Sequence, residues 1–228
     1  MKKLYFFLLA AISVLLYSCG STNNLADYDL RQQTIFFDEI VAMTSAQVEI
    51  VHSNNKQAKT ELDVLGEIAT SIGKAVLTNE TEAKLREAAR PRLVVDDISN
   101  GVENALVKYL MVVPSRTLDM DAKFVVTTTL EELKILSTTG GVYMRCKATV
   151  TITDRQSGGL VWENTEAENV PIRRSYSSSN NTAATIAQAA DLASLSQEEM
   201  EQAVESASNE VGRLMTETLR QDINEASQ

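Results

Sequence analysis

The strongest constraint on the fold is a segment, residues 142–153, in which apolar and polar side chains alternate without interruption. Successive side chains of a β-strand point to opposite faces of its sheet, so this period predicts a strand with one buried and one solvated face. The side chains expected on the buried face are Val142, Met144, Cys146, Ala148, Val150 and Ile152. We therefore expect an antiparallel sheet that helices cover on one side.

The segment before this strand has the same period of two but changes parity part of the way along. One face is shared by Phe124, Val126, Thr128 and Leu130, whereas Leu133 and Ile135 fall on the opposite parity. A β-bulge near Glu131 and Glu132 would account for the change, and so would a strand that bends across the core.

Two turns complete a three-stranded meander. Thr138–Gly141 and Asp154–Gly159 are rich in the residues that tight turns prefer, so each predicts a turn between strands. The third strand is expected to begin at Leu160, and its acidic, irregular continuation, Glu163–Val170, is typical of an edge strand. The predicted fold class is α+β, with a three-stranded antiparallel meander packed against helices and preceded by a helical N-terminal segment.

On both sides of the meander, the spacing of the apolar residues is typical of helices. Between residues 27 and 90 the apolar residues are spaced by three and four, which predicts a helical hairpin or a pair of long helices. A shorter helix is expected from Ser99 or Asn100 to Pro114, which would stop it.

The last helix is expected to begin after Ser196, with Glu199 placed to complete a capping box. Its apolar stripe is formed by Met200, Val204, Ala207, Val211, Leu214 and Thr218. We expect the stripe to pack on the sheet, and a helix of a partner is the alternative.

The N-terminus is organised as a signal peptide. Lys2 and Lys3 are followed by an apolar run from Leu4 to Tyr17. At 1.5 Å per residue this run forms about 21 Å of helix, which is too short for a bilayer core of about 30 Å. Residues 1–18 are therefore predicted to be cleaved before Cys19.

The sequence Leu16-Tyr17-Ser18-Cys19 resembles the lipobox of bacterial lipoproteins. The resemblance implies a diacylglycerol on the Cys19 sulfur and acylation of its new amine, with palmitate as the expected acyl group. Gly20 stands where Asp would retain an enterobacterial lipoprotein in the inner membrane. The implied location is the outer membrane, on its periplasmic face, with Cys19 as the membrane anchor and residues 19–30 as a polar tether.

A second resemblance is carried by Thr151–Trp162, in which a strand is followed by Asp, two spacers, Ser-Gly and then aliphatic residues before Trp162. This stretch is similar to the ABC-transporter auxiliary lipoproteins, the curli-secretion lipoprotein and the activators of penicillin-binding proteins. The resemblance covers roughly residues 96–223 and implies a compact α/β domain. The expected domains are a helical segment over residues 31–90 and an α/β lipoprotein domain over residues 91–228.

The composition argues against several classes of function. The net charge of −10 and the pI near 4.7 argue against nucleic-acid binding, which needs a basic surface. His52 is the sole histidine, and no phosphate-binding, metal or nucleophile motif is present in the sequence. Cys146 lies on the predicted buried face and is expected to be a structural thiol. We expect no enzyme, no catalytic residue, no cofactor and no metal.

The function favoured by these features is that of a non-catalytic outer-membrane lipoprotein, an accessory subunit that docks an envelope protein partner for transport or assembly. One alternative is a module that binds lipid or another apolar ligand, and another is a self-assembling structural component, hence a homo-oligomer. A docking subunit predicts a filled core and an exposed apolar patch, whereas a ligand-binding module predicts a large apolar pocket.

Overall fold

The computed structural model describes residues 21–43, 45–50, 79–118, 121–138, 140–174 and 190–227. The elements in chain order are β1 (Thr22–Asn23), the 3-10 helix η1 (Leu25–Asp27), β2 (Thr34–Val41), β3 (Gln47–Ile50), α3 (Pro91–Leu110), β4 (Val113–Ser115), β5 (Phe124–Thr138), β6 (Gly141–Asp154), β7 (Leu160–Arg174) and α5 (Gln197–Ala226). Residues 79–89 and 190–193 are also helical. Signal-peptide residues 1–18, Cys19 and His52 lie outside the described residues.

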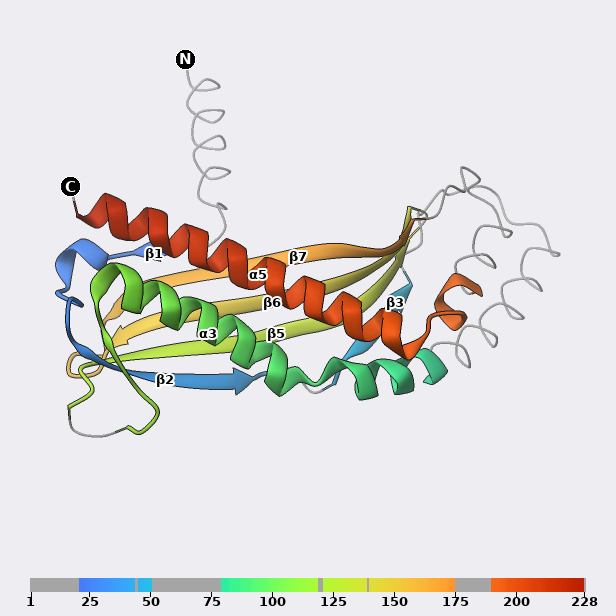
Figure 1. The fold of residues 1–228 in the computed structure, drawn as a ribbon, viewed down its shortest axis with the longest axis horizontal. Helices are drawn as coiled ribbons and strands as arrows, with labels where there is room; N and C mark the ends of the chain where they lie inside the picture. Colours follow the sequence, from blue (N-terminus) through green and yellow to red (C-terminus); the bar gives the residue numbers. More distant parts are fainter. Residues whose placement is uncertain are drawn as a thin grey trace, which may run out of the picture.

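The described strands form one seven-stranded sheet, and α3 and α5 lie side by side against one of its faces (Figure 1). The strand order is β1-β7-β6-β5-β2-β4, and β3 also pairs with β5. Strands β5, β6 and β7 pair antiparallel, whereas β2 and β3 run parallel to β5. The fold is therefore α+β as expected, but the sheet is larger than the predicted meander and mixes both kinds of pairing.

The helical segment predicted for residues 31–90 is wrong over β2 and β3. In β2, Ile35 and Phe37 are buried on the helix-covered face, whereas Phe36 and Asp38 face the other side of the sheet. Adjacent apolar pairs satisfy a helical period as well as a strand period, so pairing with β5 decides the structure here. Residues 79–89 are helical as expected, and residues 51–78 lie outside the described part.

Helix α3 begins earlier than predicted. It starts at Pro91 rather than after Ser99 or Asn100, because proline is well suited to the first helical position, where its missing N–H is not needed. The helix ends at Leu110, and Met111 takes a left-handed backbone conformation. Pro114 does not stop the helix directly, since it lies in the short strand β4.

The β-bulge predicted near Glu131 and Glu132 is confirmed. The register of β5 against β6 shifts between Leu130 and Glu132, so Leu130 and Leu133 are both buried on the helix-covered face. The gap between β2 and β3 lies opposite the bulge, where the Ala42 N–H donates to the Leu130 carbonyl at 3.0 Å.

The core between the sheet and the helices is filled. Two clusters of buried apolar residues lie along it, one around Met144 and Met200 and the other around Phe124 and Trp162. The stripe on α5 is buried as predicted from Met200 to Val211, but it then continues through Met215, Leu219 and Ile223 instead of Leu214 and Thr218. From Val211 onward the buried apolar side chains are four positions apart, which moves the apolar stripe around the helix. Thr218 lies beside the stripe, and its hydroxyl donates to the Glu166 carboxylate of β7 at 3.2 Å.

The predicted capping box at the start of α5 is confirmed. The Ser196 hydroxyl accepts from the Glu199 N–H, and the Glu199 carboxylate accepts from the Ser196 N–H at 2.8 Å. Arg173, near the end of β7, donates from Nη2 to both Glu199 oxygens, at 2.7 and 2.8 Å. The Ser196 N–H and the Arg173 guanidinium lower the pKa of Glu199 to about 2.

We predict that Glu199→Gln lowers the free energy of unfolding by about 1 kcal/mol near neutral pH. The lowered pKa means that the ionised carboxylate stabilises the fold above its ordinary pKa of 4.5, and that this stabilisation is lost as the pH falls toward about 2. Urea titrations from about pH 6 to about pH 3 should therefore show the difference from wild type shrinking. Glu205→Gln, at an exposed position of the same helix, should show no such pH dependence.

Candidate functional site

Cys146 and the residues of the stretch Thr151–Trp162 have structural roles in the described part of the chain. Cys146 is fully buried on the helix-covered face of β6, and burial raises the pKa of its thiol to about 12. Asp154 forms the turn between β6 and β7, where its carboxylate accepts from the N–H groups of Gln156 and Ser157 at 2.7 and 2.9 Å. Within the stretch Thr151–Trp162, Asp154 and Gly158 thus form the turn of a β-hairpin. Its Trp162 is buried and donates to Asp222 of α5 at 2.6 Å.

The described residues hold no cluster typical of a metal centre and no helix that could span a membrane. No three His, Cys, Asp or Glu side chains in that part of the chain gather where they could hold a metal ion. In the same part, no helix is both long enough and apolar enough to cross a membrane.

Residues 22–30, which were expected to belong to a polar tether, are docked on the domain. Thr22 pairs with Glu163, and Asn24 donates from its side-chain amide to the Leu160 carbonyl at 2.9 Å. Leu25 and Leu30 are buried. The interpretation as a tether is therefore wrong for these residues, because their apolar side chains complete the core at one end of the domain.

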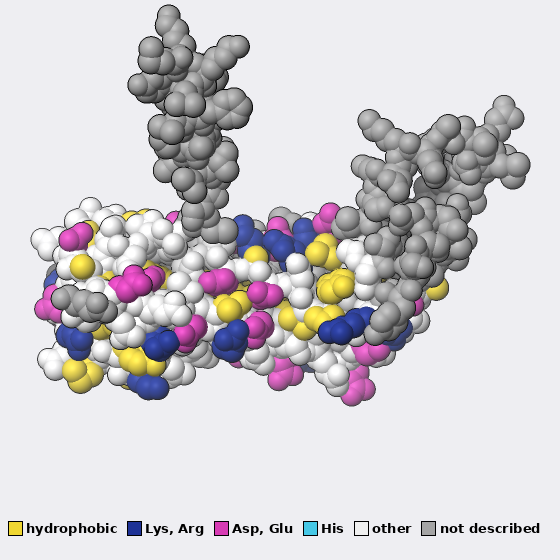
Figure 2. All heavy atoms as spheres, turned by 90° about the horizontal axis from the view of Figure 1, so that it is seen from above, with side chains coloured by type: hydrophobic (Ala, Val, Ile, Leu, Met, Phe, Trp, Pro, Cys, Tyr) yellow, Lys and Arg dark blue, Asp and Glu magenta, His cyan; other side chains and the backbone are white. Residues whose placement is uncertain are grey.

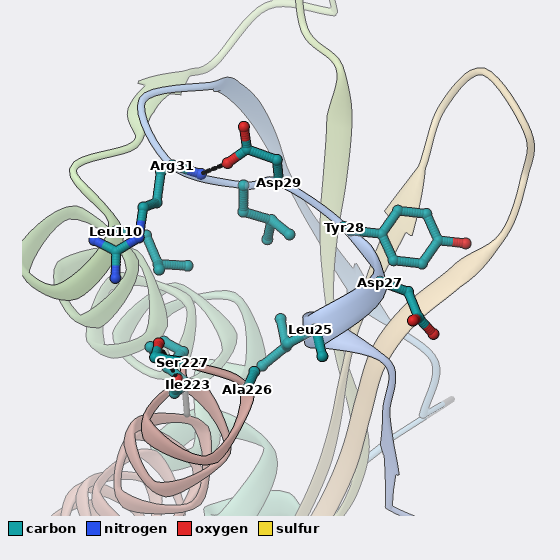
Figure 3. A pocket seen from close by; sticks show the side chains of 11 residues that line it. Leu25, Asp27, Tyr28, Asp29, Arg31, Leu110, Ile223, Ala226 and Ser227 are labelled. Atoms are coloured by element: carbon teal, nitrogen blue, oxygen red, sulfur yellow. Dashed lines mark hydrogen bonds between the residues drawn. The ribbon is translucent and has the colours of Figure 1, made fainter.

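Three segments that are far apart in the sequence meet at this end, where both long helices finish (Figures 1 and 3). Residues 25–31 cross the end of the domain, and the Gln32 N–H donates to the Leu110 carbonyl at 3.0 Å. The last turn of α5 contributes Ile223 and Ala226. An open recess of about 490 Å³ lies between these segments, a volume in the range of small-molecule sites.

The recess has an apolar floor and a charged rim. Leu25, Leu110 and Ile223 surround the space, while Tyr28 points away from it and the Arg31 side chain extends toward Leu110 (Figure 3). Tyr28 packs edge-on against the Phe124 ring at 6.3 Å between centroids and therefore fixes residues 25–31 to the sheet. Asp27 and Asp29 also line the recess, but their carboxylates point away from it (Figure 3).

Exposed apolar side chains are concentrated at the end of α3 and in the segment that follows it. Six large apolar residues of the described chain are well exposed, and four of them belong to the end of α3 and to the segment after it: Val107, Met111, Val113 and Leu118. Arg116 holds that segment against the domain through ion pairs with Glu39 at 2.9 Å and Glu103 at 2.7 Å. We call the recess and these four residues the end surface. It is the candidate functional site.

The end surface was not foreseen from the sequence. Its parts come from residues 25–31, 107–118 and 223–227, so no motif of fixed spacing marks it. Leu25, Tyr28 and Leu30 were the available signal, because three apolar side chains within six residues are unusual in a free tether.

Comparison with known proteins does not assign the chain to a family. No family model matches it, and no curated protein matches it. Similar solved structures include a PelC dodecamer from Paraburkholderia phytofirmans, with 12% identity over 81% of this chain and 96% of that chain and a TM-score of 0.32. A DUF330 protein from Xanthomonas campestris has 12% identity over 90% of this chain and 95% of that chain, with a TM-score of 0.36.

A third solved structure, of a candidate lipoprotein from Caulobacter crescentus, has 15% identity over 54% of this chain and 83% of that chain, with a TM-score of 0.24. At identities and TM-scores this low, none of these likenesses carries an argument about the function of this chain.

We predict that Leu30→Ala lowers the free energy of unfolding by about 2 kcal/mol or more, because Leu30 is buried beneath the end surface. Urea unfolding followed by Trp162 fluorescence measures the change. Arg31→Ala, at the next, exposed position, is the control and should change the stability by less than about 0.5 kcal/mol. Equal, small effects of both substitutions would contradict the docking of residues 22–30.

Proposed function

We propose that the chain is a non-catalytic lipoprotein, anchored in the outer membrane through Cys19, whose end surface docks a protein partner in the envelope. The observation that supports this role most directly is the combination of a filled core with apolar side chains left exposed at the end surface. A docking subunit needs such a surface and an anchor, and it needs no reactive group.

The shape of the end surface suits a protein partner. Binding energy in protein interfaces is concentrated where a large side chain of one partner fills a recess of the other. The recess between Leu25, Leu110 and Ile223 offers such a place, and Met111 and Val113 extend the apolar area beyond it. Asp27, Asp29 and Arg31 supply polar groups for the rim of the interface.

A module that binds a small apolar ligand is the second candidate, and the volume of the recess favours it. One observation favours docking instead. The recess is open to solvent, whereas small-molecule sites enclose most of their ligand.

We propose no catalytic activity. Support for this comes from Cys146, the sole thiol besides the proposed lipidation site, which is buried and carries a raised pKa. A thiol that stays protonated is a poor nucleophile.

The test is site-specific photo-crosslinking in intact outer membranes, with the crosslinking residue at position 111 or at position 93. Met111 and Leu93 are matched, because both belong to the α3 region and are 54% and 52% exposed, respectively. We expect one defined protein adduct from position 111 and none from position 93. Equal adducts from both positions would contradict the proposal, and an adduct of the chain with itself at position 111 would favour self-assembly.

We further predict that Met111→Glu weakens binding of the crosslinked partner about tenfold or more, because a charge would be buried at the apolar contact. Leu93→Glu should leave the affinity unchanged. Both variants should keep the wild-type urea midpoint, since both side chains are exposed. Incorporation of radiolabelled palmitate in wild type, and its loss in Cys19→Ala, tests the anchor separately.

A further inference from the structure

We infer that the sheet edge formed by β1 and β7 faces the lipid surface, and that the opposite edge, formed by β2 and β4, points away from it. This inference rests on the proposed lipidation of Cys19 and adds to it the orientation of the domain. We call the two sides the anchor edge and the distal edge.

The first argument is the length of chain between the anchor and the sheet. One residue of extended chain spans at most about 3.6 Å, so Thr22 lies within about 11 Å of the Cys19 backbone. Thr22 is fixed in place by pairing with Glu163, and the next residues are held by the bond from the Asn24 N–H to the Val161 carbonyl at 2.9 Å. Lipidation of Cys19 would therefore hold the anchor edge close to the bilayer.

The second argument is the order of the strands. Strand β1 lies at one end of the order and β4 at the other, with β7, β6, β5 and β2 between them. Neighbouring strands are about 4.8 Å apart, so the five steps separate the two edges by about 24 Å. The paired residues run almost straight across the sheet, from Asn23 through Trp162, Ile152, Val126 and Phe37. With the sheet standing on its anchor edge, the distal edge would therefore lie about 24 Å from the lipid surface.

The third argument is the chemistry of the two edges. Strand β7 is 15 residues long, and β1 pairs with only Trp162 and Glu163 of it. Beyond them, Ala167, Asn169 and Pro171 are exposed and uncharged, Glu166 and Glu168 are half-buried, and Arg174 is exposed and basic. No large apolar side chain of β7 is well exposed, which suits contact with the polar headgroups rather than with the hydrocarbon core. Seen from above, acidic and basic side chains are interspersed along the molecule (Figure 2).

A nearby lipid surface would also shield the edge of β7 from pairing with other chains, to which long edge strands are prone. The distal edge differs, because Val113 is 54% exposed there and Met111 lies close to it in the chain. These apolar residues lie on the side away from the lipid, which favours a protein contact over insertion into the membrane.

The test uses the full-length lipidated protein in vesicles of phosphatidylethanolamine and phosphatidylglycerol that contain a headgroup-nitroxide lipid. A fluorophore is attached to a single cysteine introduced as Ala167→Cys on the anchor edge or Leu118→Cys near the distal edge. Cys146 is buried and does not compete for the label. We expect several-fold stronger nitroxide quenching of the label at position 167. Equal quenching, or stronger quenching at position 118, would overturn the inference.

Two controls separate this inference from the proposed function. Vesicle flotation reports anchoring alone: failure to float would overturn the lipid anchor, whereas flotation with equal quenching would overturn only the orientation. A flexible Gly/Ser linker of about 12 residues, inserted after Gly20, has a root-mean-square length of about 20 Å. It should preserve flotation and remove most of the difference in quenching. An unchanged difference would show that the short link does not set the orientation.

Discussion

The structure depends on the burial of one face of the sheet under α5. The apolar stripe of this helix runs from Met200 to Ile223 and contributes to both buried clusters, so one helix covers the sheet along its length. Helix α3 packs closely on α5 at Gly101, where an added Cβ would lie 3.3 Å from the Thr216 hydroxyl oxygen. Arg173 and Glu199 fix the start of α5 to the end of β7, and Trp162 and Asp222 fix its other end.

The parts of the fold that were predictable are those set by neighbouring residues. The alternation in β6, the bulge in β5 and the capping box of α5 each depend on a few consecutive positions, and the structure has all three. Strands β2 and β3 were taken for helix because they pair in parallel with β5, about 90 residues further along the chain. Local spacing of apolar residues does not report such long-range pairing.

The candidate site was less predictable than the fold. Local patterns placed Cys146 on the buried face, and the structure shows it there. The end surface is built instead from residues 25–31, the end of α3 and the last turn of α5. It exists only once Leu25 and Leu30 are docked on the domain. A surface assembled by tertiary contacts has no spacing that a sequence pattern could reveal.

The parallel arrangement of α3 and α5 has a consequence for how fast a partner would find the end surface. Each helix carries about half a negative charge at its C-terminal end, and both of these ends lie at the same end of the domain (Figure 1). Asp27 and Asp29 lie there as well, on a chain whose net charge is −10, and Arg31 and Lys108 offset only part of this negative charge. The resulting field would accelerate association with a partner that presents a basic patch, and added salt would slow that association.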